Sequence, residues 1–145
     1  MHRPARAVLR TEMRPENFHC LLHILGANAI DWLEGVAGPR IRIEVRASAA
    51  RCELVFADNG PGIPAGVGER VFEPLFSRKE DGRGMGLAIA KQLLESHGGS
   101  IVLLSDGRRK GANFLLTFPR KRSRATLYER DAADEHGQLS SRRAD

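Results

Sequence analysis

The sequence predicts an α+β domain: a two-layer α/β sandwich in which helices pack on one face of a mixed, mainly antiparallel sheet. Three observations support this prediction. Two segments carry apolar residues at helical spacing, two further pairs of segments read as strand hairpins, and a glycine-rich stretch lies between the two halves. The chain has 145 residues, of which 41% are hydrophobic, so it is long enough for one globular domain with its own core.

The first predicted element is a helix over residues 14–35, with a proline in its first turn and Gly35 at its end. Its apolar residues recur at helical spacing: Phe18, Leu21, Leu22, Leu25, Ala29 and Trp32. Asn28 falls on this apolar stripe, and Asp31 follows one turn later on the same side. A buried amide needs partners, so Asn28 either hydrogen-bonds a backbone group or faces a cavity where its oxygen ligates a hard cation such as Mg²⁺.

A hairpin follows, with strands predicted over residues 41–48 and 52–57 because apolar and polar residues alternate there. Residues 58–86 then hold seven of the 15 glycines and read as a long irregular segment. Irregular segments of this length inside a compact domain are usually functional.

The irregular segment opens with the sequence DNGPGIP at residues 58–64, directly after a hydrophobic strand. Asp58 could serve only the turn, since Asp, Asn, Gly and Pro are the favoured turn residues. It could also accept a hydrogen bond from a ligand, with Gly60 and Gly62 allowing the backbone to come close. Both interpretations stay open at this point.

A second helix is predicted to begin at Gly84 or Met85 and to end at His97, before a Gly-Gly stop. Strands over residues 100–104 and 113–118 follow, joined by a turn at Asp106 and Gly107. The glycines that open this helix, Gly82, Gly84 and Gly86, free backbone N–H groups to point at an anion. No hydrophobic strand precedes them and no Gly-Lys-Ser/Thr occurs, so neither a dinucleotide fold nor a P-loop is expected.

Other function classes find little support. Cys20 and Cys52 stand alone and are expected to be small buried hydrophobes. His19 and His23 have the i, i+4 spacing of a metal pair but lack further ligands. The net charge of +5 is dispersed along the chain, so nucleic acid is not an expected partner.

The chain also lacks an apolar run that could cross a membrane and an apolar leader, so we expect a cytoplasmic protein whose segment makes no membrane contact. Residues 1–13 read as an N-terminal lead and residues 14–119 as the folded domain. Residues 120–145 read as a charged tail that is expected to be disordered.

Five segments, taken in order, resemble the motifs of the GHKL ATP-binding superfamily. They are NAID at residues 28–31, DNGPGIP at 58–64, VFEPLFSRK at 71–79, GRGMGL at 82–87 and HGG at 97–99. The superfamily unites sensor histidine kinases, gyrase, the Hsp90 chaperones and MutL. The third segment and its short gap to the glycines are most similar to the catalytic domain of sensor histidine kinases.

The resemblance implies an α/β sandwich that binds ATP and Mg²⁺, with Asn28 as the magnesium ligand and Asp58 as acceptor for the adenine amino group. It further implies that Phe72 and Phe76 hinge a lid and that Lys79 gives the phosphates a counter-charge. The nucleotide-binding set implied as a whole is Asn28, Asp31, Asp58, Gly60, Gly62, Ile63, Phe72, Lys79, Gly82, Gly84, Met85, Gly86 and Leu87.

The implied activity is that of an ATP-dependent protein-histidine kinase, which passes the γ-phosphoryl group to a histidine on another domain or chain. The implied partners are a histidine-bearing dimerisation domain, in cis or in trans, and a downstream response regulator. No histidine here precedes an acidic residue, as a phosphoacceptor would. Ile24 stands four residues before Asn28, where superfamily members usually carry a polar residue. The alternative is therefore an ATP-binding regulatory module without turnover, whereas a free-standing ATPase is not expected.

Overall fold

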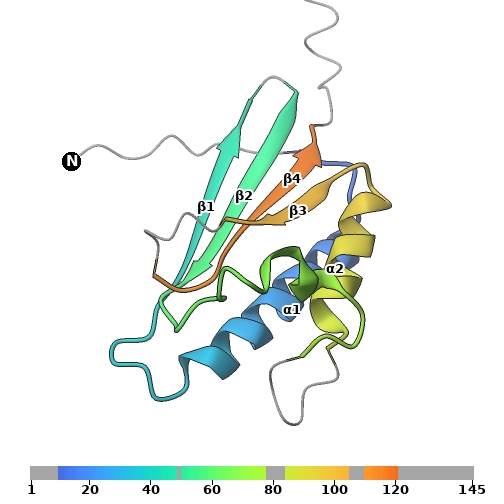
Figure 1. The fold of residues 1–145 in the computed structure, drawn as a ribbon. Helices are drawn as coiled ribbons and strands as arrows, with labels where there is room; N and C mark the ends of the chain where they lie inside the picture. Colours follow the sequence, from blue (N-terminus) through green and yellow to red (C-terminus); the bar gives the residue numbers. More distant parts are fainter. Residues whose placement is uncertain (1–9, 49, 78–83, 105–109, 121–145) are drawn as a thin grey trace, which may run out of the picture.

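The computed structural model describes residues 10–48, 50–77, 84–104 and 110–120. Within these residues the chain forms two helices, a short 3-10 helix and four strands (Figure 1). Their bounds are α1 (Pro15–Leu33), β1 (Ile41–Ala47), β2 (Arg51–Asp58), η1 (Gly68–Phe72), α2 (Gly86–Glu95), β3 (Ser100–Leu103) and β4 (Asn113–Pro119). The predicted turn at Asp106 and Gly107, residues 1–9 of the predicted lead and residues 121–145 of the predicted tail lie outside the described residues.

The four strands form one sheet in the order β1-β2-β4-β3, and each neighbouring pair is antiparallel. The α+β prediction is confirmed, but the expectation of a mixed sheet is wrong for the described strands. The reason lies in β4, which returns from β3 as a hairpin and pairs on its other side with β2. Both pairings are antiparallel, so no parallel neighbour arises.

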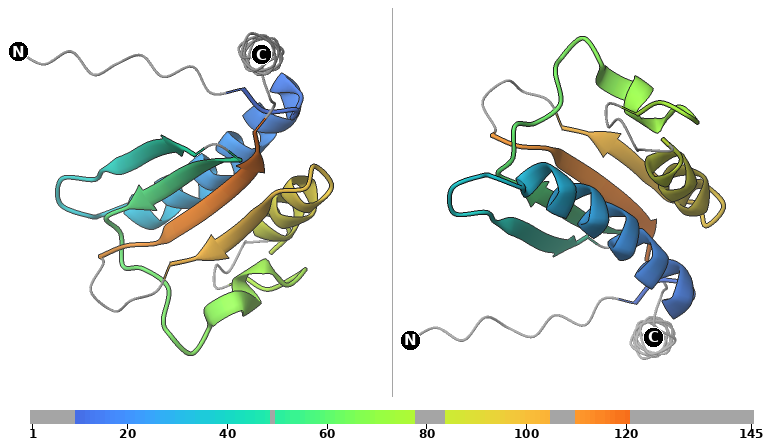
Figure 2. Two further views of the ribbon diagram at one scale, coloured as in Figure 1. Left: turned by 90° about the horizontal axis from the view of Figure 1, so that it is seen from above. Right: turned by 90° about the horizontal axis from the view of Figure 1, so that it is seen from below.

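Both helices lie on the same face of the sheet, α1 below β2 and α2 below β3 (Figure 2). The largest side chains that are completely buried between the layers are Leu21, Leu25, Leu94 and Leu116. Each such leucine contributes about 1.5–3 kcal/mol by leaving water. The helical period predicted the first two, and the alternation of β4 places Leu116 on the same inner face as Phe114 and Phe118.

The HGG motif connects the two helices. His97 Nδ1 lies 2.8 Å from the Leu93 carbonyl oxygen, which can only accept, so this nitrogen carries the proton. Nε2 is then the acceptor for the Asn17 side-chain amide, 3.1 Å away at the start of α1. A Cβ on Gly99 would overlap the backbone oxygen of Thr117. The motif therefore fixes the distance between α1, the end of α2 and the sheet.

Candidate functional site

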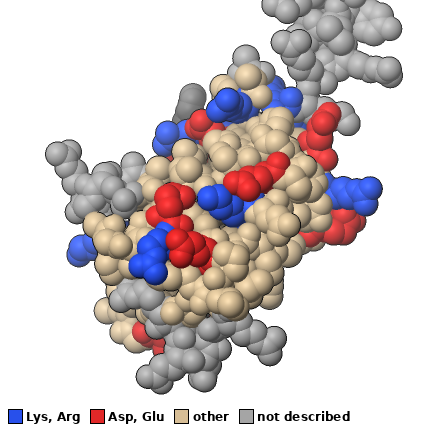
Figure 3. Space-filling model, turned by 45° about the vertical axis from the view of Figure 1, so that its right-hand side comes forward, with Lys and Arg blue, Asp and Glu red and all other residues tan. Residues whose placement is uncertain are grey.

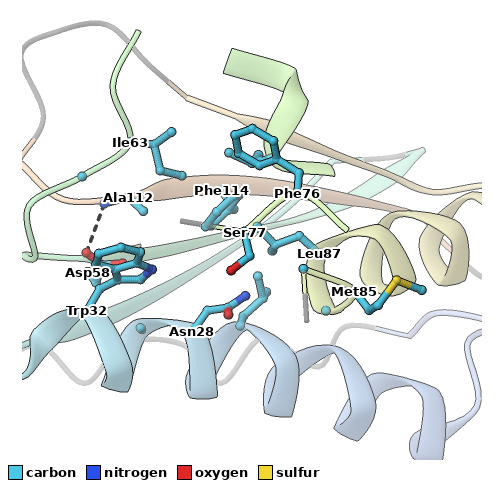
Figure 4. A pocket seen from close by; sticks show the side chains of 16 residues that line it. Asn28, Trp32, Asp58, Ile63, Phe76, Ser77, Met85, Leu87, Ala112 and Phe114 are labelled. Carbon is cyan, nitrogen blue, oxygen red and sulfur yellow. Dashed lines mark hydrogen bonds between the residues drawn. The ribbon is translucent and has the colours of Figure 1, made fainter. Parts of the chain in front are cut away.

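A cavity of about 260 Å³ opens between α1, the start of α2, the segment after η1 and the adjoining ends of β2 and β4 (Figure 4). This volume lies just below the roughly 300–1,000 Å³ that is typical of small-molecule sites. Its walls are mainly apolar, and polar side chains come from Asn28, Asp58 and Ser77. The remaining lining residues are Leu25, Ala29, Trp32, Gly62, Ile63, Val71, Phe76, Gly84, Met85, Gly86, Leu87, Ala112 and Phe114.

Asp58, the last residue of β2, is held in place by backbone donors. Its Oδ1 accepts from the N–H of Gly60 at 2.9 Å and from the N–H of Ala112 at 3.1 Å. Its Oδ2 makes no hydrogen bond with another described residue. The side chain thus serves the turn through one oxygen and also lines the cavity, while its role toward a ligand stays a prediction.

The neighbouring Asn59 has a different task. Its Oδ1 accepts from the N–H of Arg40 at 2.7 Å, and its Nδ2 donates to the Gly38 carbonyl oxygen at 2.9 Å. These bonds tie the loop before β1 to the end of β2. Asn59 does not line the cavity.

Gly111 permits the close packing of β4 against Asp58. Its φ is +79°, and a Cβ there would overlap the backbone oxygen of Asp58. Gly62 also has φ +79°, and its Cβ position lies 3.2 Å from the Gly111 carbonyl oxygen. Only residues without a Cβ allow these two loop segments to meet at the cavity wall.

Asn28 projects from α1 into the cavity, toward Ser77 (Figure 4). It is half-buried and makes no hydrogen bond with another described residue. Of the two interpretations of this amide, the structure supports the cavity-facing one. The role of its oxygen as a ligand of a cation stays a prediction.

The start of α2 forms another wall of the cavity through Gly84, Met85, Gly86 and Leu87. The helix has no side-chain N-cap and no acidic residue in its first turn. Its first backbone N–H groups and the helix dipole therefore favour an anion there. Gly84 has φ +63°, and a Cβ would come within 2.5 Å of the Leu75 backbone, so this glycine lets the helix start against the preceding segment.

Three predicted residues, Asp31, Phe72 and Gly60, do not line the cavity. Asp31 is exposed and does not line the cavity, because α1 turns it beyond the edge of the cavity. Phe72 is 5% exposed and packs edge-on against Phe114 in the core, whereas Phe76 lines the cavity. Gly60 does not line the cavity, but its N–H donates a hydrogen bond to Asp58. The expectations for Lys79 and Gly82 fall outside the described residues.

Trp32 lines the cavity, although the helical period predicted it to lie in the core. The helical period put it on the core stripe, yet its side chain is 39% exposed and borders the cavity beside Asp58 (Figure 4). The available signal was its position four residues after Asn28, which places both side chains on one side of the helix. The sequence pattern did not predict that Ser77 and Ala112 line the cavity. Ala112 bonds Asp58 through its backbone N–H, which its residue type does not reveal.

Charge elsewhere on the described surface is mixed. On the face drawn in Figure 3, basic and acidic side chains lie interspersed. His19 and His23 are both exposed, and the described residues hold no group of three side chains suited to a metal ion. None of the described helices combines the length and apolarity that a membrane crossing requires.

Comparisons with known proteins agree with this geometry. Residues 14–122 match the family model described as histidine kinase-, DNA gyrase B-, and HSP90-like ATPase. Sensor protein CitS of Halalkalibacterium halodurans is 36% identical over 118 residues, covering 77% of this chain and 22% of CitS. Sensor histidine kinase ZraS of Klebsiella oxytoca is 34% identical over 115 residues, covering 78% of this chain and 24% of ZraS. The chain thus spans less than a quarter of these relatives.

Solved structures show the same fold. The mycobacterial sensor histidine kinase MprB superposes with a TM-score of 0.69 at 26% identity, covering 79% of this chain and 80% of that one. The catalytic domain of histidine kinase ThkA gives 0.68 at 27% identity, covering 79% and 74%. Fold and cavity define an ATP-binding catalytic domain of the sensor histidine kinase type. The chain belongs to the histidine kinase-, DNA gyrase B-, and HSP90-like ATPase family.

Proposed function

We propose that the cavity binds ATP as its magnesium complex and presents the γ-phosphoryl group to a histidine on another domain or chain. The observation that carries this proposal is the pairing of a fixed carboxylate, Asp58, with the uncapped start of α2 on the walls of one cavity. The carboxylate can accept a hydrogen bond from a donor on a base, and the start of the helix can bind an anion. Residues 14–119 are proposed as the unit that carries this activity.

The base is proposed to lie against Asp58, with Gly62 and Ile63 on one side and Trp32 nearby. Asp58 Oδ2 can only accept as a carboxylate, so it pairs with the amino group of adenine and opposes the carbonyl group of guanine. A hydrogen bond to a charged group is worth about 1.5–3 kcal/mol, so ATP should bind at least about tenfold more tightly than GTP.

The Mg²⁺ that accompanies ATP is proposed to bind the side-chain oxygen of Asn28. Mg²⁺ prefers oxygen ligands and takes few of them from protein when phosphates and water supply the rest. The single amide oxygen of Asn28 at the cavity wall is a ligand of this kind. The ion would neutralise part of the phosphate charge. Gly84, Met85, Gly86 and Leu87 would hold the phosphates by backbone N–H groups. Gly82 and Lys79 are proposed to add a further donor and a counter-charge.

Positioning and charge neutralisation would then supply the catalysis, because no covalent intermediate on this chain is needed. A histidine of a dimerisation domain, in cis or in trans, is the proposed acceptor, and a response regulator would take the phosphoryl group onward. Ile24 offers no carboxylate to activate water beside Asn28, so hydrolysis by this chain should be slow.

The test is incubation of the chain with γ-labelled ATP and Mg²⁺, with and without a histidine-bearing dimerisation domain added in trans. Label on the histidine of that domain supports the kinase proposal. Tight binding of ATP without transfer or hydrolysis would contradict it and identify a regulatory binding module. Release of labelled phosphate without the added domain would identify an ATPase instead.

A further inference from the structure

Strand β1 forms one edge of the sheet and leaves apolar side chains exposed. Ile41, Ile43 and Val45 are 40%, 49% and 53% exposed. Their register opposite Asp58, Phe56 and Leu54 puts them on the helix-covered side of the sheet, where Phe56 and Leu54 are buried. Because α1 lies below β2, β1 extends beyond the cover of the helices (Figure 2). Exposed apolar strand edges mark sites of association.

The free edge of β1 has the backbone geometry to pair with another strand. The Arg40 carbonyl oxygen accepts from the N–H of Asn59, directly after β2, and the Ser48 N–H donates to the Arg51 carbonyl oxygen. Alternation therefore directs the backbone groups of Arg42, Glu44 and Arg46 toward β2. The backbone N–H and C=O groups of Ile41, Ile43 and Val45 consequently point away from the sheet. The strand contains neither a proline nor a bulge, two of the devices that protect an edge, and its charged side chains Arg42, Glu44 and Arg46 lie on the side away from the helices.

We propose that β1 pairs antiparallel with β1 of a second copy of this chain, about a twofold axis at Ile43. Ile43 then faces Ile43 of the second copy, and Ile41 faces Val45 of the second copy. Ile41, Ile43 and Val45 exchange hydrogen bonds with the second copy across the axis, and their side chains form one apolar strip below the joined sheets. Pro39 lacks an N–H group and ends the ladder.

Charge on the opposite side of the strand excludes one competing register, and apolar contact distinguishes the other. Arg42 comes to lie opposite Glu44 of the second copy, and the symmetry repeats that pair. A twofold axis at Glu44 would instead place Glu44 against Glu44 and Arg42 against Arg46, which destabilises a strand pair. An axis at Val45 would also place Glu44 opposite Arg46, but it would oppose Ile43 to Ala47 and so reduce the apolar contact, which favours the axis at Ile43. The inference is independent of the proposed function, although Ile41 pairs with Asp58 and the interface therefore lies one strand from the cavity.

The first experiment measures the molar mass of the full chain by sedimentation equilibrium over a range of concentrations. The wild type should associate reversibly to a dimer, and Ile43→Lys should raise the dissociation constant at least about tenfold. Val102→Lys is the matched control, since Val102 is 38% exposed on the opposite edge strand, and it should leave the dimer unchanged. A wild-type monomer at every concentration, or equal effects of the two variants, would overturn the proposal.

The second experiment tests the register in chains that carry Cys20→Ser. Ile43→Cys should form a disulfide-linked dimer under mild oxidation, because residues that face each other in a hydrogen-bonded pair have Cα atoms about 5.5 Å apart. Val45→Cys should stay unlinked. Arg42→Glu should weaken the dimer, and the double variant Arg42→Glu/Glu44→Arg should restore it. Cross-linking through position 45 but not 43, or no rescue by the double variant, would overturn the register.

Discussion

The backbone N–H of Ala112 donates a 3.1 Å hydrogen bond to Asp58 Oδ1 and so joins the start of β4 to the end of β2. The same oxygen accepts from Gly60. Two backbone donors on one oxygen hold the carboxylate in a fixed orientation before any ligand arrives. A pre-oriented acceptor binds its ligand without a further loss of side-chain entropy.

Gly111→Ala should remove this arrangement. The new Cβ would meet a positive φ and overlap the Asp58 backbone. Gly35→Ala is the matched control, because Gly35 has φ +77° and no heavy atom within 4 Å of its Cβ position. Urea denaturation should show that the control lowers the free energy of unfolding by about 1 kcal/mol. Gly111→Ala should lower it clearly more. Equal losses would show that the contact with Asp58 is unimportant.

Trp32 should report on ATP and contribute to its binding. It is the only tryptophan of the chain, so its fluorescence should change saturably on titration with Mg·ATP. Stacking of a base on an aromatic side chain is worth about 1–3 kcal/mol, so Trp32→Ala should weaken ATP binding about tenfold or more. Trp32→Phe should retain most of the affinity. Full ATP affinity of Trp32→Ala would remove the tryptophan from the proposed base site.

Asn28→Ala should lower ATP affinity only when Mg²⁺ is present. Calorimetric titrations with Mg²⁺ and with EDTA separate the ion from the nucleotide. Asn17→Ala is a control on the same helix, where the side chain contacts His97 away from the cavity, and it should not alter the magnesium dependence. A loss of affinity for Asn28→Ala that is equal with and without Mg²⁺ would contradict the metal assignment.

Regular periodicity made much of the fold predictable. The apolar repeat placed α1 within two residues of its observed bounds, and alternation placed β1 and β2 as a hairpin. The helical period does not show how much of the apolar stripe is buried. In α1 the stripe is wider than the surface that the sheet covers, so Trp32 at its border lies at the cavity. The insertion of β4 between β2 and β3 depends on tertiary packing, which no local pattern encodes.

The site was predictable where side chains carry the chemistry. Asn28 and Asp58 were found by residue type and position, and both line the cavity. Phe72 and Phe76 lie in an irregular segment without a period, so the sequence could not distinguish the core residue from the cavity residue. The roles of Gly111 and Ala112 come from φ and a backbone N–H, properties that residue type alone does not reveal.

The most direct test of base recognition by Asp58 is a calorimetric comparison of ATP and ITP binding to the wild type and to Asp58→Asn. The variant keeps an oxygen for Gly60 and Ala112 but replaces Oδ2 by an amide donor, so the fold should survive. ATP affinity should fall at least about tenfold, while ITP, which carries a carbonyl group in place of the amino group, should bind the variant more tightly than the wild type. Unchanged ATP affinity with no gain for ITP would contradict the assignment of Asp58 as the residue that reads the base.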